Sequence, residues 1–312
     1  MNIAISGANG FIGKNLTLAL KKIQNVNLYY INRFHLKDSL ANKNDYSFED
    51  FFKGRINAEF DFFIHLASPN YDYCNDGSLN EGIIELTRKV LNSLSKYNCK
   101  NLIFFSTCKV YGESTLSKEI YNEMSTLRPV SDYANAKVEA ENLIKEVSKK
   151  DNINYLIYRM PFVYGPGMKS NISKLLSLID KSIPVPTFGH HNGLKKSFLS
   201  TENIIKAVSY NLKNPDSVDN GTYNLSDTES VSLDFFLKEY KRVSGAKTII
   251  ISFSKSISNI FFQIPIINKI IIKIFGNFQI DNTKILKKID NIFISTSEGI
   301  SMLIIGKIDK YE

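Results

Sequence analysis

Short apolar runs alternate with stretches of helical spacing along the first half of the chain. The apolar runs predict strands at residues 2–6, 28–31, 61–67, 101–106 and 154–158. Apolar side chains spaced three to four apart predict helices over residues 11–23, 83–94 and 133–147. Strands that alternate with helices, and whose apolar residues run without alternation, are typical of parallel strands covered on both faces. The pattern predicts an α/β protein with a doubly wound parallel sheet of the Rossmann type.

The second half of the chain has a looser pattern. A helix is expected over 172–179, a turn or extended piece at 183–186, and mainly helical structure after about residue 228. Two short apolar pieces, 197–199 and 223–225, are expected to return to the first sheet as strands. We therefore predict a smaller, interwoven α/β domain for binding the substrate. The predicted domains are residues 1–163, with returning pieces near 195–226, and residues 164–194 with 227–312.

One segment, residues 256–275, is almost as apolar as a membrane-spanning helix. A spanning helix needs about 20 apolar residues. Two polar residues, one proline and two lysines interrupt this run: Asn259, Gln263, Pro265, Lys269 and Lys273. We expect a helix that is broken at Pro265 and packs on its own domain, with no membrane span. A helix lying in a membrane interface is the alternative.

Composition narrows the class of protein further. The 312 residues include three cysteines without a CxxC pair, and the apolar start is too short for a signal peptide, so a cytoplasmic location is expected. The net charge of +8 fits a basic solvated surface, or an anionic substrate such as a sugar diphosphate. Basic runs without regular aromatics give no indication of nucleic-acid binding. No set of His, Cys and acidic residues has ligand spacing, so no metal is predicted.

Three glycines follow the first predicted strand and open the first predicted helix. In a dinucleotide site, Gly7 allows a tight turn, Gly10 leaves room for the pyrophosphate, and Gly13 lets helix and strand approach closely. The helix N-terminus then offers unpaired N–H groups to the phosphates. The strand before and the helix after make this pattern more specific than glycines alone.

The second predicted strand ends at Asn32 and Arg33. An NAD site usually has an acidic residue there, which accepts hydrogen bonds from the ribose hydroxyls. Asn32 has no charge, and Arg33 could pair with a 2′-phosphate. The pattern slightly favours NADP(H) over NAD(H).

Tyr133 and Lys137 are four residues apart and therefore lie on one face of the predicted helix. A neighbouring ammonium is expected to lower the pKa of the phenol, which could then exchange a proton with a substrate hydroxyl. Thr107 closes the predicted strand 101–106. Ligands of an open parallel sheet bind at the carboxyl ends of its strands, so the Thr107 hydroxyl is expected to contact the same substrate oxygen.

With these residues in view, the sequence resembles the extended short-chain dehydrogenase/reductases that act on nucleotide sugars, nearly from end to end. The resemblance rests on Gly7–Gly13, Asp61 with His65–Ala67, Ser106–Gly112, Tyr133 with Lys137, Tyr158–Gly167, Lys196–Phe198 followed by Asn203, and Asp281–Lys284.

The resemblance implies roles for individual residues and, for the whole chain, a place in surface polysaccharide biosynthesis. The implied catalytic residues are Thr107, Tyr133 and Lys137. The implied cofactor contacts are Gly7, Asn9, Gly10, Phe11, Ile12, Asn32, Arg33, Leu66, Ala67, Tyr133, Lys137 and Pro161. The implied substrate contacts are Thr107, Cys108, Asn171 and Lys196, with no chemical role for the Cys108 thiol. A homodimer paired through helices is also common in the family.

Departures from the family pattern narrow the reaction. Cys108 and Lys109 stand where 4,6-dehydratases often have an Asp-Glu pair, which disfavours dehydration. Phe162 stands where many 4-epimerases have an asparagine. Our first interpretation is therefore a reductase of a nucleotide-linked 4-keto sugar, with Tyr133 as the proton donor. A nucleotide-sugar 4-epimerase is the second, and a non-catalytic nucleotide-binding scaffold is the third.

Two histidine positions are interpreted without a chemical role. His65 is expected to pack at a strand end, and His190 with His191 to lie in a solvated turn.

Overall fold

The fold is built on a seven-stranded parallel sheet with the strand order β11-β7-β5-β4-β1-β2-β3. The computed structural model describes residues 1–33, 44–68, 79–187, 194–253 and 263–308. The strands are β1 (Asn2–Ser6), β2 (Asn27–Asn32), β3 (Asp45–Ser47), β4 (Phe62–His65), β5 (Asn101–Thr107), β7 (Asn154–Met160) and β11 (Gly221–Asn224). The strand order reverses beside β1, because the chain adds β2 and β3 on one side and β4 onward on the other. This topology confirms the predicted doubly wound α/β fold.

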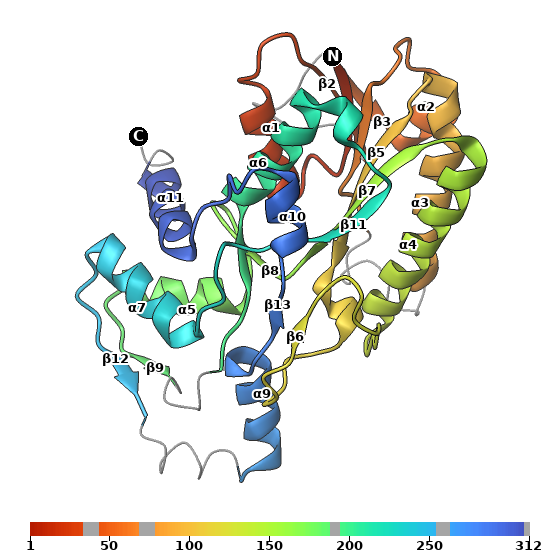
Figure 1. The fold of residues 1–312 in the computed structure, drawn as a ribbon. Coiled ribbons are helices and arrows are strands. Elements are labelled where there is room, and N and C mark those ends of the chain that lie inside the picture. The colour runs from red at the N-terminus through yellow and green to blue at the C-terminus, as the bar shows by residue number, and fades with distance from the viewer. Residues whose placement is uncertain (34–43, 69–78, 188–193, 254–262, 309–312) are drawn as a thin grey trace. The chain divides into compact units, whose positions relative to one another are not determined.

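Helices cover both faces of this sheet, as Figure 1 shows, with α3 and α4 on one face and α1 and α6 on the other. Their bounds are α1 (Phe11–Leu20), α3 (Leu79–Leu94), α4 (Asp132–Asp151) and α6 (Thr201–Lys213). The apolar face of α4, with Ala136, Ala140 and Ile144, packs in one core cluster with sheet residues such as Phe104 and Ile157. Burial on both faces explains why the strands read as continuous apolar runs.

The chain divides into two compact units, each made of several segments. The first unit contains residues Met1–Val110, Leu127–Met160 and Ile205–Tyr223. The second contains Tyr111–Thr126, Pro161–Ile204 and Asn224–Glu312. These units are defined by their internal contacts, so the assignment of a nucleotide-binding and a substrate-binding domain stays a prediction.

The second unit combines three small parallel strand pairs with helices. The pairs are β6 (Ile120–Tyr121) with β13 (Gln279–Ile280), β8 (Phe162–Tyr164) with β10 (Phe198–Ser200), and β9 (Val185–Thr187) with β12 (Ile250–Ser252). The helices are α5 (Asn171–Asp180), α7 (Leu233–Ser244), α9 (Pro265–Phe275), α10 (Thr283–Lys288) and α11 (Thr296–Ile308). A second core cluster joins aromatic side chains of this unit, among them Tyr164, Phe198 and Phe236.

One of the two strands expected to return to the central sheet does not do so. Residues 221–224 form β11 and join the sheet at its edge, as predicted. The piece expected at 197–199 forms β10, which instead pairs with β8. Pro161 separates β7 from β8 and has no N–H to donate, so the ladder of the central sheet ends before it. β8 then lies in the second unit, where β10 is its partner.

The apolar segment near the C-terminus forms a helix, α9, that begins at Pro265 rather than breaking there. Proline suits this first helical position, because the N–H that it lacks has no partner within a helix. Residues 254–262 lie outside the described part of the chain. Ile271 is buried, whereas Lys269 and Ile270 are exposed, so only part of the helix surface packs. Within the described ranges no helix is long and apolar enough to cross a membrane.

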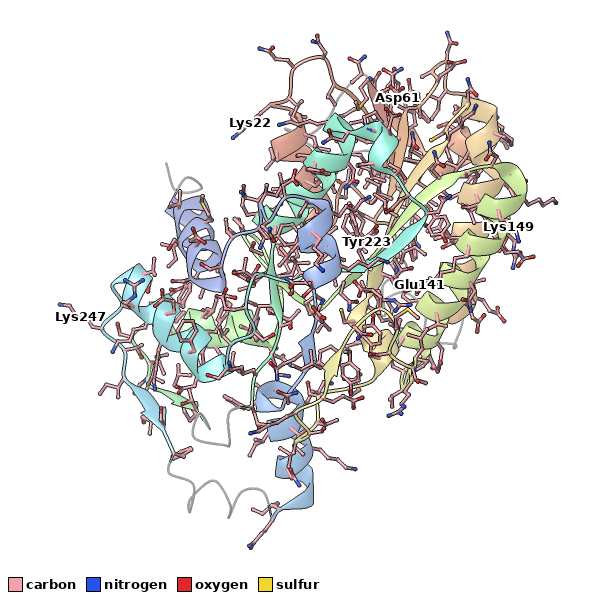
Figure 2. All side chains as sticks on the ribbon, in the orientation of Figure 1. Lys22, Asp61, Glu141, Lys149, Tyr223 and Lys247 are labelled. Atoms are coloured by element: carbon pink, nitrogen blue, oxygen red, sulfur yellow. The ribbon has the colours of Figure 1, made fainter. Side chains whose placement is uncertain are left out.

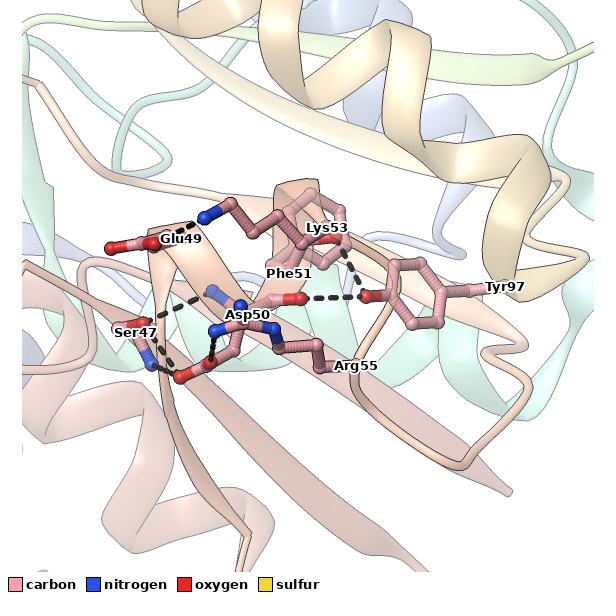
Figure 3. Close-up of polar contacts among 7 residues, drawn as sticks. All are labelled: Ser47, Glu49, Asp50, Phe51, Lys53, Arg55 and Tyr97. Atoms are coloured by element: carbon pink, nitrogen blue, oxygen red, sulfur yellow. Dashed lines mark hydrogen bonds and ion pairs between the residues drawn. The ribbon is translucent and has the colours of Figure 1, made fainter.

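The edge of the central sheet includes two elements that the pattern did not predict, β3 and the short helix α2 (Phe48–Phe52) (Figure 3). The Ser47 hydroxyl accepts a hydrogen bond from the Asp50 N–H at 3.0 Å, and the Asp50 carboxylate accepts one from the Ser47 N–H at 3.3 Å. This reciprocal capping box starts the helix. At its other end, the Tyr97 hydroxyl donates to the Phe51 carbonyl at 2.7 Å. This hydrogen bond links α2 to the segment that precedes β5.

Candidate active site

The turn after β1 has the geometry that its glycines predict. Gly7 has a φ of +79°, in the left-handed region that favours glycine, and a Cβ there would lie 2.7 Å from the Ala67 nitrogen. A Cβ at Gly13 would lie 2.2 Å from the Gly7 carbonyl oxygen. Ala67 follows β4, the strand that neighbours β1. The turn therefore packs tightly at the carboxyl ends of β1 and β4, where the strand order reverses.

The N-terminus of α1 is open to an anion. Gly10 is the N-cap, and no side chain caps the helix or places an acidic group in its first turn. Phe11 and Ile12 are half-buried in that turn, and Asn9 and Gly10 are exposed. Uncapped N–H groups and the positive end of the helix dipole favour a phosphate at this position. The close glycine turn and the uncapped helix fit the pyrophosphate of a dinucleotide.

A carboxylate lies beside the end of β2, although no acidic residue ends that strand. Asn32 is buried, and its side-chain amide donates to the Asp45 carboxylate at 3.1 Å. Arg33 follows as an exposed residue. Sequence reasoning missed Asp45 because it lies on β3, a strand that the pattern did not predict. The carboxylate beside Asn32 is a group that would repel a 2′-phosphate.

The predicted catalytic side chains come from two neighbouring elements of the first unit, β5 and α4. Thr107 is the last residue of β5 and is 9 % exposed. On α4, Lys137 is 3 % exposed, and its ammonium donates to the Phe105 carbonyl of β5 at 3.0 Å. The same ammonium nitrogen lies 4.6 Å from the centroid of the Phe104 ring and 5.9 Å from that of the Tyr133 ring. The structure therefore brings Lys137 and Tyr133 together against the C-terminal end of β5.

Burial dominates the protonation of these groups. It raises the pKa of Tyr133 to about 12 and lowers the pKa of Lys137 to about 8, with the Glu141 carboxylate opposing the fall for Lys137. Our expectation that the ammonium lowers the phenol's pKa is therefore wrong. The physical reason is that the phenolate loses hydration on burial, and this outweighs the attraction of an ammonium that is itself desolvated and bonded to a carbonyl.

A buried polar cluster lies one helical turn beyond Lys137. The Glu141 carboxylate accepts a hydrogen bond from the Ser106 hydroxyl at 2.5 Å and pairs with the Arg159 guanidinium at 2.6 Å. The side chains of Glu141 and Arg159 are 1 % and 3 % exposed. Sequence reasoning did not assign this cluster. A carboxylate four residues after Lys137, and an arginine inside an apolar strand, were the signals that could have revealed it.

His65 packs at the end of β4, as expected. Its Nδ1 and the Ser6 Oγ form a 2.7 Å hydrogen bond, and its ring lies near those of Phe63 and Phe104. Burial, and to a smaller degree the charge of Lys137, lower the pKa of His65 to about 3. The ring is therefore neutral at physiological pH. Among the described residues, no group of three or more His, Cys, Asp and Glu side chains could hold a metal ion.

The predicted diphosphate contacts belong to the second unit. Asn171 is exposed at the start of α5, where Ser170 caps the helix. Lys196 is 9 % exposed, and its ammonium donates to the Ser114 hydroxyl at 2.5 Å and to the Lys273 carbonyl at 3.2 Å. The Lys196 side chain is therefore held by its own unit. The roles of both residues stay predictions.

The remaining predicted contacts lie in different surroundings. Cys108 is fully buried directly after β5, and Leu66 is half-buried after β4. Pro161 is half-buried in the second unit. The ring of Phe162 packs edge-on against Phe198, with centroids 5.9 Å apart. His190 and His191 lie outside the described residues.

The sequence matches a known family over more than half of its length. A sequence model of the NAD dependent epimerase/dehydratase family matches residues 3–226, which is more than half of the chain. The chain belongs to this family.

Relatives of known function are enzymes that act on nucleotide sugars or related sugar diphosphates. The UDP-glucose 4-epimerase of Vibrio cholerae is 27% identical over 256 residues, covering 76% of this chain and 74% of the relative. The N-acetyl-alpha-D-glucosaminyl-diphospho-ditrans,octacis-undecaprenol 4-epimerase of Escherichia coli O157:H7 is 25% identical over 251 residues, covering 79% of this chain and 73% of the relative.

Solved structures share the fold over nearly the whole chain. The UDP-glucuronic acid 4-epimerase of Bacillus cereus in complex with NAD has a TM-score of 0.74 at 19% identity, covering 98% of this chain and 96% of that chain. The RMD protein of Pseudomonas aeruginosa complexed with NADPH has a TM-score of 0.71 at 15% identity, covering 98% and 99%. Structural neighbours of this chain thus bind NAD or NADPH.

Proposed function

We propose that this protein is an NAD(P)-dependent 4-epimerase of a nucleotide-linked sugar. The observation that carries the proposal is the buried Lys137 ammonium, bonded to the Phe105 carbonyl and lying beside the Tyr133 ring at the end of β5. The 4-epimerases among its relatives support inversion at C4 over the keto-sugar reduction that the sequence first suggested. Asn171 and Lys196 are proposed to contact the diphosphate.

The proposed chemistry assigns one task to each side chain. A nicotinamide cofactor, when bound, would supply the hydride chemistry at C4. Tyr133, as the phenolate, would take the proton of the C4 hydroxyl during oxidation at C4, and as the phenol it would return that proton to the same oxygen during reduction. The Thr107 hydroxyl donates a hydrogen bond to the same oxygen. The Lys137 ammonium would stabilise the phenolate as it forms and would bond the nicotinamide ribose.

A reductase of a 4-keto sugar is the second candidate, and one observation favours it. The pKa of Tyr133, raised to about 12, keeps the phenol protonated near neutral pH. A protonated phenol suits a donor to a ketone better than a base for a hydroxyl. Phe162, in place of the asparagine common in 4-epimerases, points the same way.

Two side chains near the end of β2 support different cofactors. Arg33 supports NADP(H), which the sequence slightly favoured, because its guanidinium could pair with a 2′-phosphate. The Asp45 carboxylate beside Asn32 supports NAD(H), because it could accept from the ribose hydroxyls instead. Fluorescence titration of the protein with NADH and NADPH measures this preference directly.

The test of the reaction is incubation with two panels of substrates. UDP- and dTDP-linked 4-hydroxy sugars, given without added cofactor, should be converted to their C4 epimers, as followed by chromatography. Nucleotide 4-keto sugars, given with NADH or NADPH, should consume the cofactor in proportion to product only if the protein is a reductase. Tyr133→Phe should reduce either activity by about 10²–10⁴-fold. The control Tyr155→Phe changes a half-buried tyrosine on β7 and should retain it. A Tyr133→Phe variant as active as the wild type would refute the proposed role of Tyr133. A wild-type protein that converts no substrate of either panel would refute the proposed function and favour the non-catalytic scaffold.

A further inference from the structure

The first unit holds a buried ion pair that none of the proposed catalytic steps uses. Glu141, labelled in Figure 2, comes from the inner side of α4, whereas Lys149 projects from the same helix into solvent. The Arg159 Nε lies 3.1 Å and 3.2 Å from the two carboxylate oxygens of Glu141, and its Nη2 lies 2.6 Å from one of them. The guanidinium therefore meets the carboxylate side-on with two nitrogens. Such a fork fixes orientation as well as distance.

Stability alone is a weak reason for this pair. Removing two charges from water costs about as much as their attraction returns, so well-packed apolar residues often serve as well. Most buried positions of β5 and β7 are apolar: Leu102–Phe105 in β5, and Leu156 with Ile157 in β7. A polar cluster retained in such surroundings is better explained by what it orients.

The cluster joins the two elements that carry the candidate catalytic residues. Tyr133, Lys137 and Glu141 follow one another at four-residue intervals on α4, so they share one face of the helix. The Ser106 hydroxyl, which donates to Glu141, directly precedes Thr107 on β5. Arg159 stands opposite Ser106 in the register of β5 and β7. One carboxylate thus ties α4 to both strands at the level of the site.

We propose that Glu141 is a positioning residue that sets the register of Tyr133 and Lys137 against Thr107 and places a buried negative charge one helical turn from the Lys137 ammonium. This inference rests on the proposed function for its effect on turnover. Its electrostatic part concerns the protein alone and can be measured without a substrate.

The charges around Lys137 come from three elements. Glu141 raises the pKa of Lys137 against the effect of burial, and Tyr133 on the same helix contributes a neutral phenol. His65 of β4 stays neutral because burial lowers its pKa to about 3. Arg159 of β7 neutralises part of the Glu141 charge. The pKa of Lys145 on α4 is lowered by burial, raised by Glu141 and lowered by Arg159. Glu141 is therefore the anion that acts on Lys137.

The experiment compares Glu141→Gln with Glu139→Gln. Gln keeps the shape of Glu141 and an oxygen that can accept from Ser106, but it removes the charge. Glu139 is an exposed carboxylate two residues earlier on α4, so its variant removes the same charge outside the cluster. The ¹⁵N NMR titration of the Lys137 amine, in protein without substrate, reports its protonation. The pH profiles of kcat and KM report its effect on turnover.

The expected results separate positioning from a purely structural role. In Glu141→Gln the Lys137 titration should move to lower pH by about one unit. The alkaline limb of kcat should move with it, and kcat should fall by about tenfold or more with a small change in KM. Glu139→Gln should match the wild type in each measurement. Because Glu141→Gln removes the carboxylate that balances the charge of the buried Arg159, the double variant Glu141→Leu/Arg159→Met provides a second form if the first does not fold. It should fold and show the same shift.

Two outcomes would overturn the inference. One is a Lys137 titration in Glu141→Gln or the double variant that matches the wild type. The other is a lower melting temperature with unchanged kcat and unchanged pH profile, which is the signature of a structural pair. A wild-type protein that turns over no sugar refutes the proposed function instead, and the amine titration still decides the electrostatic part.

Discussion

Gly13→Ala would place one methyl group into the tightest contact of the glycine turn. The new Cβ would lie 2.2 Å from the Gly7 carbonyl oxygen and 2.8 Å from the Ala8 Cα. Both are backbone atoms, so no side chain can rotate away, and the loop must move by about 1 Å to reach ordinary contact. Overpacking costs about 1–3 kcal/mol, and its upper end applies to rigid backbone. The higher helix propensity of alanine returns about 1 kcal/mol. The net loss of unfolding free energy is about 2 kcal/mol.

Thermal unfolding and cofactor titration measure the effect together. A loss of this size should lower Tm by roughly 3 °C in a chain of 312 residues. The displaced turn should also weaken NADH or NADPH binding by about tenfold. Gly245→Ala is the control, because Gly245 has a φ of +69° but a Cβ there would have no atom within 4 Å. It should lower Tm through backbone strain and leave cofactor affinity unchanged. Wild-type Tm and affinity in Gly13→Ala would show that the close approach does not constrain this turn.

Three further predictions concern protonation. Tyr133→Phe should reduce kcat by about 10²–10⁴-fold while NAD(P)H still binds, as steady-state rates and fluorescence titration would show. Because burial lowers the pKa of His65 to about 3, only the unfolded chain gains a proton as pH falls below about 6.5. Urea denaturation should show stability falling there by about 1.4 kcal/mol per pH unit, and His65→Gln should lose that contribution. The pKa of Lys137, lowered to about 8, predicts a change of stability at alkaline pH. Stability should rise from pH 8 towards the unfolded value of 10.5, and a Lys137→Met variant that keeps the same rise would contradict this account.

The strands of the central sheet could be predicted because burial on both faces leaves a strong local signal. Residues 3–5 and 102–105 are continuous apolar runs, and both lie in strands of that sheet. Short edge elements leave no such signal. β3 has three half-buried residues, and β10 has a partner, β8, that no local pattern could name. Pairing between distant segments is decided by which edges remain open after the larger elements pack.

The candidate site divides in the same way. Gly7, Gly13, Tyr133 and Lys137 could be identified because turn geometry and helical spacing are local properties of the chain. The protonation of Tyr133 could not be predicted, because spacing gives the distance to an ammonium but not the loss of water around the phenol. Helical spacing revealed the attraction of the ammonium but not the larger effect, which is the loss of hydration of the phenolate.

The sequence by itself determined the parallel α/β fold, the glycine turn and the pairing of a tyrosine with a lysine on one helix face. Only the tertiary structure decided what surrounds that pair. Ser106 and Arg159 are 53 residues apart in sequence, yet the register of β5 and β7 sets them opposite each other, within reach of Glu141. The physical reason is that burial and long-range contacts depend on the whole packed chain. A carboxylate that would be an ordinary surface charge on an isolated helix becomes the buried partner of two strands.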